Sequence, residues 1–254
     1  MRPYSRIAIV VLIFGLNAFA QTAEELVAKN IQAKGGLDKI KAIQSVRMSG
    51  TQDNGGFKAA VTQENKRPNL VRATFALQGM TAVQAYDGGS GWQVRPFGGR
   101  KDPELMGEDD LRGMLLDADF DGPLVDYAAK GNKIEYMGHD QVDGDDAYKL
   151  KVTLKNGDIT YYYLDPDTYL EIRKEFQMFI RGSVQESFVN LGSYKPVNGV
   201  MFPFSIANGP KGSDHPPNTT YDKIEVNATI QESGFALPAS LKQDAAKKPD
   251  APKN

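Results

Sequence analysis

The most constraining feature of the sequence is a two-residue alternation of apolar and polar side chains that recurs along most of the chain. The alternating runs are about five to eight residues long and are bounded by Gly, Asn or Asp, which is typical of half-buried antiparallel strands. We predict about eleven strands, one starting at Lys133 and the others around Val46–Met48, Phe57–Val61, Val71–Phe75, Trp92–Val94, Tyr148–Leu154, Ile159–Tyr163, Leu170–Ile172, Ser187–Val189, Gly199–Ile206 and Tyr221–Ile230.

Two segments depart from this alternation and have apolar residues at helical spacing. Thr22–Ile43 predicts a helix or a helix pair, because Gly35-Gly36 interrupts it. Pro103–Gly131 predicts two short helices joined by a turn at Asp117–Gly122.

Strands with one apolar face need a second layer to cover that face. A second sheet, a closed barrel or a plug of helices could each provide it. Since the predicted helices are amphipathic, we favour a mainly β fold with some α structure. It would be an incomplete antiparallel β-barrel with an N-terminal helix and a helical lid covering an apolar cavity.

The first twenty residues have the three-part pattern of a secretory signal. Arg2 and Arg6 precede the apolar or Gly run Ile7–Leu16, and Ala18-Phe19-Ala20 places small residues at a cleavage site. A run of this length is about half of the ~20 residues that span a bilayer. The chain has no Cys for lipid attachment. We therefore expect cleavage after Ala20 and a periplasmic protein, starting at Gln21, without stable membrane insertion.

The organisation that we predict is a signal peptide at 1–20, one domain at 21–240 and a disordered tail at 241–254. The tail is rich in Lys, Asp, Ala and Pro and has no apolar anchor. The formal net charge of −2 comes without a basic stripe, so no nucleic-acid partner is expected. We expect a monomer.

No catalytic motif is evident. His139 and His215 are the two His residues, and neither has a second His at zinc-binding spacing. Gly88–Gly91 resembles a nucleophile elbow, but Trp92 stands where the final Gly is required. We therefore expect no enzymatic activity, no cofactor and no metal.

One acidic segment matches part of a calcium loop. Asp117, Asp119, Asp121 and Gly122 fit the first positions, but Ala128 stands where a bidentate Glu must close the coordination shell. A polar turn between two lid helices is the favoured interpretation, and a weak calcium site at Asp117–Asp121 stays open.

Several blocks resemble a known family. Lys66-Arg67-Pro68-Asn69-Leu70, followed by Tyr86-Asp87-Gly88 and Trp92, resembles the outer-membrane lipoprotein-sorting (LolA-like) carriers. The resemblance covers about residues 22–240 and includes three later segments, Leu164–Thr168, Val197–Pro203 and the stretch from Val226-Asn227 through Phe235–Pro238.

The resemblance implies an unclosed antiparallel barrel lidded by helices, with a cavity for acyl chains. It also implies an inner-membrane donor and an outer-membrane acceptor as partners. An Arg at position 67 would hold the lid closed; the alternative is a solvated surface Arg. The region Gly98–Gly131 is not closely matched, which leaves the identity of the lipid open.

Residues on the apolar phase of the strands and of the lid are the candidate ligand-binding side chains. Met and aromatic side chains suit such a site because they repack around varied chains. The alternative is that they form ordinary core. The candidates are Met48, Phe57, Phe75, Met80, Tyr86, Trp92, Leu111, Met114 and Leu115.

Three functions fit the sequence. The leading hypothesis is a periplasmic carrier that binds acyl chains of a lipoprotein or another envelope lipid and moves them toward the outer membrane. The second is an envelope sensor or scaffold that binds a protein partner with the same half-barrel. The third is a hydrolase without a recognisable motif.

Overall fold

The computed structural model describes residues 21–180 and 182–242. The predicted signal peptide (1–20) and residues 243–254 of the tail predicted at 241–254 lie outside the described residues. Leu241, placed in that tail by the prediction, is instead buried at the end of a short 3₁₀ helix. The described α-helices are α1 (Ala23–Ala33), α2 (Leu37–Ala42) and α3 (Glu108–Ala118). The described strands are β1 (Ser45–Asp53), β2 (Lys58–Lys66), β3 (Leu70–Leu77), β4 (Met80–Tyr86), β5 (Gly91–Arg95), β6 (Arg100–Leu105), β7 (Lys133–Val142), β8 (Asp145–Thr153), β9 (Ile159–Leu164), β10 (Glu171–Ile180), β11 (Ser183–Gly192), β12 (Lys195–Val197), β13 (Val200–Phe202), β14 (Ser205–Pro210) and β15 (Asn218–Val226).

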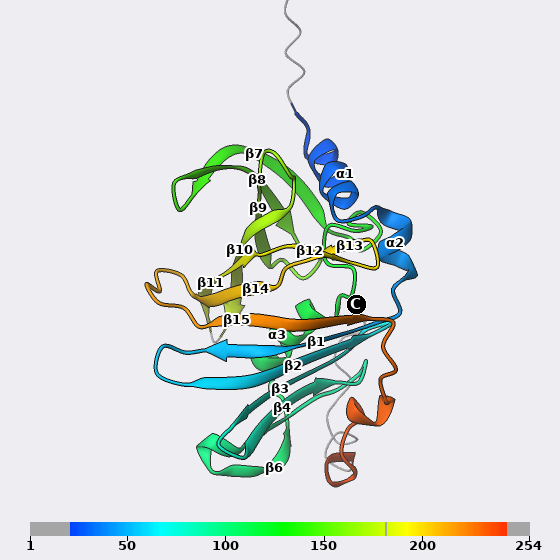
Figure 1. Ribbon diagram of the computed structural model, residues 1–254, viewed down its shortest axis with the longest axis vertical. Coiled ribbons are helices and arrows are strands. Elements are labelled where there is room, and N and C mark those ends of the chain that lie inside the picture. Colours follow the sequence, from blue (N-terminus) through cyan, green and yellow to red (C-terminus); the bar gives the residue numbers. More distant parts are fainter. Residues whose placement is uncertain (1–20, 181, 243–254) are drawn as a thin grey trace, which may run out of the picture.

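Thirteen of these strands form one antiparallel sheet in the order β6-β5-β4-β3-β2-β1-β15-β14-β11-β10-β9-β8-β7. Figure 1 shows the sheet curling from β6 at the bottom to β7 at the top. Its edge strands β6 and β7 do not pair with each other in the described part of the chain. The last strand, β15, lies between β1 and β14 and joins the two halves of the sheet. The predicted incomplete antiparallel barrel is therefore confirmed.

The structure has fifteen strands in the described residues, against about eleven expected. The sequence Arg-Lys-Asp-Pro-Glu-Leu of β6 has no apolar alternation, and Pro103 fits an edge strand. The expected strand Gly199–Ile206 is divided between β13 and β14. Asn198 and Gly199 have φ values of 51° and 77°, which suit the tight turn of the β12–β13 hairpin.

The predicted N-terminal helix pair is confirmed as α1 and α2. Thr22 and Glu25 form a reciprocal capping box at the start of α1. Leu26 and Val27 pack against β8 and β9. Gly35 ends the first helix with φ 121°, and a Cβ there would meet the carbonyl oxygen of Gly199 at 2.2 Å, so that only Gly fits.

The lid differs from the prediction in that α3 is its single helix. The second predicted helix is wrong, because residues 123–131 form successive turns. Gly122 has φ 78° and precedes Pro123, which disfavours helical backbone before it, and Asp126 has φ 53°. Met114 and Ala118 of α3 pack on β3 and β4 on the inner face of the sheet (Figure 1). Within the described residues no helix is long and apolar enough to cross a membrane.

The opposite face of β4 and β5 is covered by the segment after β15. The Trp92 indole donates a hydrogen bond of 2.9 Å to the carbonyl of Phe235, which is itself buried. A short 3₁₀ helix at Ala239–Leu241 brings Leu241 against Trp92 and Ala85. This segment, orange to red in Figure 1, gives the sheet a second buried face that the alternation does not predict.

We expect Leu241→Ala to lower the free energy of unfolding by about 2–4 kcal/mol, because the side chain is buried and its removal leaves a cavity. The measurement is urea unfolding of the mature chain followed by circular dichroism. Lys242→Ala, which changes the exposed neighbour, is the control and should unfold as the wild type does. Superimposable curves for Leu241→Ala and the wild type would contradict the packing described for this segment.

Candidate functional site

A cavity of about 300 Å³ lies between the inner face of the sheet, α2 and the loop that follows α3. Residues 116–123 form one wall, and β1, β2 and β10 contribute to the others. Most of the surface is apolar, with contributions from Ile40, Ile43, Met48, Phe176, Leu191 and Phe202. Such a volume is at the small end of ligand-binding cavities, which are mostly apolar with a few polar groups.

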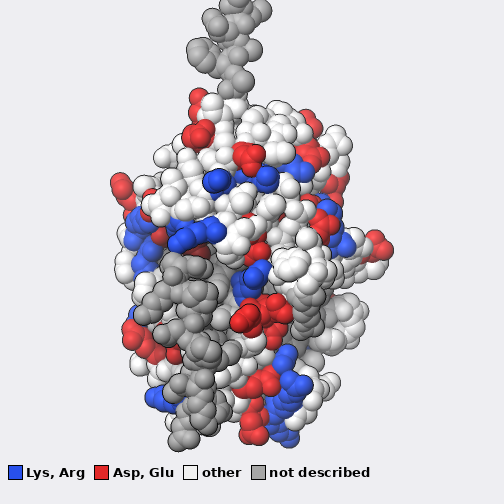
Figure 2. Space-filling view, turned by 180° about the vertical axis from the view of Figure 1, so that it is seen from behind, with Lys and Arg blue, Asp and Glu red and all other residues white. Residues whose placement is uncertain are grey.

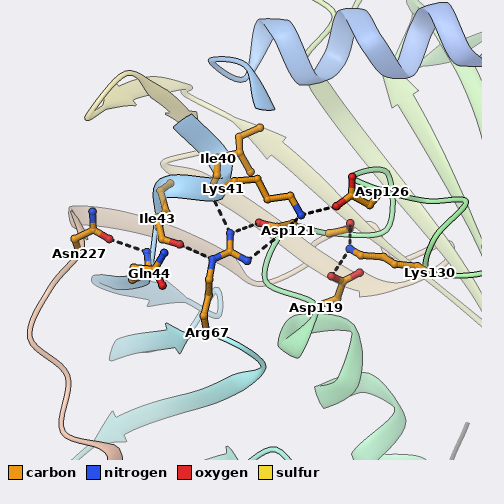
Figure 3. A network of polar contacts seen from close by, with 11 residues as sticks. Ile40, Lys41, Ile43, Gln44, Arg67, Asp119, Asp121, Asp126, Lys130 and Asn227 are labelled. Atoms are coloured by element: carbon orange, nitrogen blue, oxygen red, sulfur yellow. Dashed lines mark hydrogen bonds and ion pairs between the residues drawn. The ribbon is translucent and has the colours of Figure 1, made fainter. Parts of the chain in front are cut away.

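Arg67, between β2 and β3, joins two walls of this cavity, α2 and the loop after α3 (Figure 3). Its guanidinium forms two hydrogen bonds with the carboxylate of Asp121, of 3.0 and 2.5 Å. It also donates to the carbonyl oxygens of Ile43 (2.6 Å) and Ile40 (3.2 Å) at the end of α2. The Phe120 ring lies 4.6 Å from the guanidinium carbon. One side chain thus holds α2 and the loop after α3 together.

Two lysines reinforce this loop, which we call the closing loop (residues 119–126). Lys41 of α2 binds Asp121 at 3.0 Å and Asp126 at 2.5 Å. Lys130 binds Asp119 at 2.5 Å and the carbonyl of Gly122 at 2.8 Å. These bonds attach the closing loop to α2 and to the turns behind it.

The electrostatics of Asp121 follow from these contacts. Burial raises its pKa, but the hydrogen bonds and charges of Arg67 and Lys41 outweigh burial and hold the pKa below its ordinary value. The side chain is 6% exposed, so its two cations are its main source of solvation. The resemblance implied that an Arg at position 67 holds the lid; the contacts observed are with a carboxylate of the closing loop and carbonyls of α2.

The carboxylates of the partial calcium motif do not converge. Asp121 and Asp119 bind different cations, and Asp117 faces the cavity. In the described ranges, no group of three or more His, Asp or Glu side chains is placed to hold a metal ion. His139 lies in β7 with its ring 4.8 Å from the ring of Tyr148.

The cavity wall also carries charged groups that the sequence did not suggest. Glu171 is 3% exposed and accepts hydrogen bonds from Lys34 (3.1 Å) and the Tyr194 hydroxyl (3.2 Å). Burial raises its pKa, but the positive charges of Lys34 and Lys174 and these bonds together lower it to about 2. Glu171 is therefore a fully satisfied anion in the wall.

Asp117 and Lys174 face the same cavity without such partners. Among the described residues, neither the Asp117 carboxylate nor the Lys174 ammonium has a hydrogen bond or an ion pair. Asp117 is exposed as a residue and lines the cavity, although many protein atoms lie around its carboxylate; the Lys174 ammonium lies 5.3 Å from the Tyr162 ring. Burial raises the pKa of Asp117 to about 6, with Lys174 acting in the opposite direction, and burial lowers the pKa of Lys174. Lys174 and Phe176 are two residues apart on β10, so their side chains lie on the same face of the sheet. A lysine on the same strand face as an apolar residue was the sequence signal that Lys174 faces the interior.

The structure separates the candidate ligand-binding residues into several groups. Met48 lines the cavity. Tyr86, Leu111 and Met114 pack together in a neighbouring cluster between α3 and the sheet. Leu115, on the same helix, is 44% exposed.

Three other candidates lie away from the cavity, near one end of β2, β3 and β4. Phe57 and Phe75 pack edge to face at 6.4 Å, and Phe97 packs on Phe75 at 5.7 Å. Phe57 and Met80 are 46% and 37% exposed. They belong to the strand ends near the β1–β2 and β3–β4 turns rather than to the cavity wall.

The candidates Trp92 and Tyr86 lie on opposite faces of the sheet. Tyr86 pairs with Gly91 in the β4–β5 register, so Trp92, the next residue, points to the other face, against Ala85 and Leu241. Both faces are apolar here, because α3 covers one and the C-terminal segment the other. Trp92 emission is therefore a poor reporter of cavity occupancy.

Figure 2 shows the molecule from behind Figure 1. Basic and acidic side chains are interspersed there, and neither sign forms a continuous stripe among the described residues of that face.

Comparisons with known proteins identify the fold. No model of a known protein family matches the sequence, and no curated protein matches it. A DUF1329 family protein from Desulfovibrio piger is similar in structure, with a TM-score of 0.57 and 12% identity over 85% of this chain and 98% of that one. A LolA superfamily protein from Nitrosomonas europaea has a TM-score of 0.56 and 11% identity over 86% and 99% of the two chains. A candidate outer membrane lipoprotein-sorting protein domain from Vibrio parahaemolyticus has a TM-score of 0.53 and 12% identity over 89% and 98%.

These structures define the class of fold, which is LolA-like. The likeness extends over almost the whole of each neighbour and agrees with the resemblance seen in the sequence. At these identities it establishes the fold alone.

The charge of Asp117 should make stability depend on pH. Its pKa is 3.8 in an ordinary setting and about 6 here, so folding favours the protonated form. This contribution is fully present below the unfolded pKa and is lost as the pH rises through 6. We expect Asp117→Asn to be more stable than the wild type at pH 7.5, by about 1 kcal/mol because cavity water screens the charge, and equal to it near pH 4.

Urea unfolding at several pH values measures this difference. Asp146→Asn, which changes an exposed carboxylate of β8, is the control and should show no such pH dependence. An Asp117→Asn variant that is less stable than the wild type at every pH would show that the carboxylate is stabilising and contradict this description of the cavity.

Proposed function

We propose that this protein is a non-enzymatic periplasmic carrier that shelters the acyl chain of a lipoprotein or another envelope lipid and moves it toward the outer membrane. The observation that carries this proposal is the mostly apolar cavity of about 300 Å³ behind a closing loop that Arg67 and Asp121 hold in place. The LolA-like fold supports it. So does the signal-like pattern of residues 1–20.

The cavity would provide the free energy that keeps an acyl chain out of water. Each buried CH₂ contributes ~0.8 kcal/mol, so a long chain represents on the order of 10 kcal/mol. A carrier must also release its cargo to an acceptor. An empty state with competing stability of its own keeps the net affinity moderate.

The contacts of Arg67 would supply that competing stability. A charged hydrogen bond contributes ~1.5–3 kcal/mol net, which is enough to change the open fraction tenfold or more. Opening would separate Arg67 from Asp121 while Lys41 remains beside the same carboxylate. The closing loop could then move without leaving Asp121 unpaired.

We expect Arg67→Leu to fold, to bind an acyl probe at least threefold more tightly and to release it more slowly, because the closed state loses its main contact. The measurement is the affinity and the off-rate of a fluorescent monoacylglycerol. The matched control is Arg72→Leu, since Arg72 is a part-buried arginine of β3 that binds Glu64 at 3.3 Å. This control should match the wild type.

Two results would contradict the proposal in different ways. If Arg67→Leu and the wild type stay within twofold in affinity and off-rate, Arg67 does not close the cavity. If neither protein binds the acyl probe, the carrier function itself is wrong.

Export gives a separate prediction. We expect the mature chain to begin at Gln21 and to be recovered from the soluble periplasmic fraction, because the signal-like segment ends in Ala18-Phe19-Ala20 and the chain has no Cys for a lipid anchor. N-terminal sequencing after cell fractionation tests both points. Recovery of the uncleaved chain in the membrane pellet would contradict them.

A further inference from the structure

We propose that Lys174 is the headgroup-binding residue of the cavity and that its ligand is a lipid with one acyl chain and one anionic group, a carboxylate or a phosphate. This inference rests on the proposed carrier function and names the class of its cargo. Lys174 lies inside the cavity together with the apolar side chains of Met48, Phe176 and Phe202. A headgroup at Lys174 would therefore leave the chain in contact with apolar wall.

The first argument is that Lys174 has no hydrogen bond within residues 21–180 and 182–242, whereas its charged neighbours have theirs. Glu171 is bound to Lys34 and Tyr194, and Asp121 is bound to Arg67 and Lys41. In the described part of the chain, the Lys174 ammonium has no hydrogen bond. It lies 5.3 Å from the Tyr162 ring, and the charges of Glu171 and Asp117 favour its charged form against the cost of burial. A buried ammonium without a hydrogen-bonding partner is unfavourable, and an anionic ligand would relieve this cost.

The second argument concerns the sign of the charge that a ligand can bring. Of the cavity-lining residues that the structure describes, the charged groups without a hydrogen bond are one cation, Lys174, and one anion, Asp117, on different elements of the wall. Asp117 has a pKa of about 6 and can take up a proton near neutral pH. Protonation removes the negative charge that would repel an anionic ligand and leaves a donor that can share it. The cavity thus accepts an anion with the uptake of one proton.

No other described group at the cavity wall is placed to take up the proton instead of Asp117. Lys174 comes from β10 and Tyr221 from β15, and burial beside Asp117 raises the pKa of Tyr221 to about 12, so that it stays neutral. The other charged groups at the cavity wall are already paired, and they are Lys34, Glu171, Asp119 and Asp121.

The third argument is size. A cavity of about 300 Å³ with the loop closed is at the small end of ligand sites, which suits one chain rather than two or three. The charge and the volume together favour an anionic single-chain lipid over a neutral one or a multiply acylated one.

The experiment measures displacement of the fluorescent monoacylglycerol from the mature protein at pH 7.5 by three lipids of equal chain length. These are palmitate, palmitoyl lysophosphatidate and neutral monopalmitoyl glycerol. We expect Lys174→Met to weaken at least one anionic lipid tenfold or more and to leave the neutral one within twofold. The lipid that loses affinity identifies carboxylate or phosphate as the headgroup.

The matched control is Lys149→Met. Lys149 also lies near aromatic rings, those of Tyr161 and Tyr163, but on the other face of the sheet, and it should not alter any of the three affinities. Equal weakening of all three lipids by Lys174→Met would mean a structural role, and unchanged affinities would also overturn the proposal. If no lipid binds the wild type, the carrier function fails instead.

A second variant tests the proton without removing Lys174. Tetradecyl sulfonate keeps its charge at all pH values used and should bind the wild type at least fivefold more tightly at pH 5.5 than at pH 7.5. Asp117→Asn should bind it tightly at both. A wild-type affinity that does not change with pH, or a variant that keeps the wild-type pH dependence, would overturn the proposed role of Asp117.

Discussion

The ion pair between Arg67 and Asp121 is the contact on which the closure proposed for this cavity depends. It joins residues 54 positions apart, one at the β2–β3 junction and one in the closing loop. The same guanidinium binds two carbonyl oxygens at the end of α2, which packs on the cavity wall. Because a partly buried, bidentate pair is strong but can be broken, it suits a closure that must be reversible.

The rest of the architecture places this contact beside the cavity, between α2 and the closing loop. The sheet is open between β6 and β7 in the described residues, so its concave face needs α1, α2, α3 and the closing loop to cover it. The covering is incomplete, and the remaining space is the cavity. Its wall combines apolar side chains with a satisfied anion, Glu171, and two charged groups, Asp117 and Lys174, that form no hydrogen bond with any described residue. Burying a charged group without a partner costs free energy, so a cavity that only excluded water would be more stable without Asp117 and Lys174 in its wall.

Much of the fold could be predicted from the sequence, because two-residue alternation and helical spacing follow directly from which faces are buried. The alternation of apolar and polar residues did not indicate that both faces of the sheet are covered at β4 and β5. Trp92 and Tyr86 both look buried in the sequence, and both are, but on opposite sides of the sheet. The second face exists only because residues after β15 return to it.

The site was harder to predict for two reasons. Asp117 and Lys174 are charged residues in segments that also contain solvated ones. The shared strand face of Lys174 and Phe176 was a signal for the lysine, but the local sequence gives none for Asp117. The closing loop was expected to lead into a helix, but Gly122 and Pro123 make it a turn that brings Asp121 to Arg67. Arg67 was indicated by the family resemblance of its five-residue block rather than by its chemistry.

Native mass spectrometry of the mature protein, purified without detergent from the periplasmic fraction, tests the central claim most directly. We expect a population whose mass exceeds that of the chain by the mass of one small lipid. On denaturation, this population should release a single-chain anionic lipid. A protein that is free of lipid, and stays free of it after incubation with a total envelope lipid extract, would contradict the carrier function.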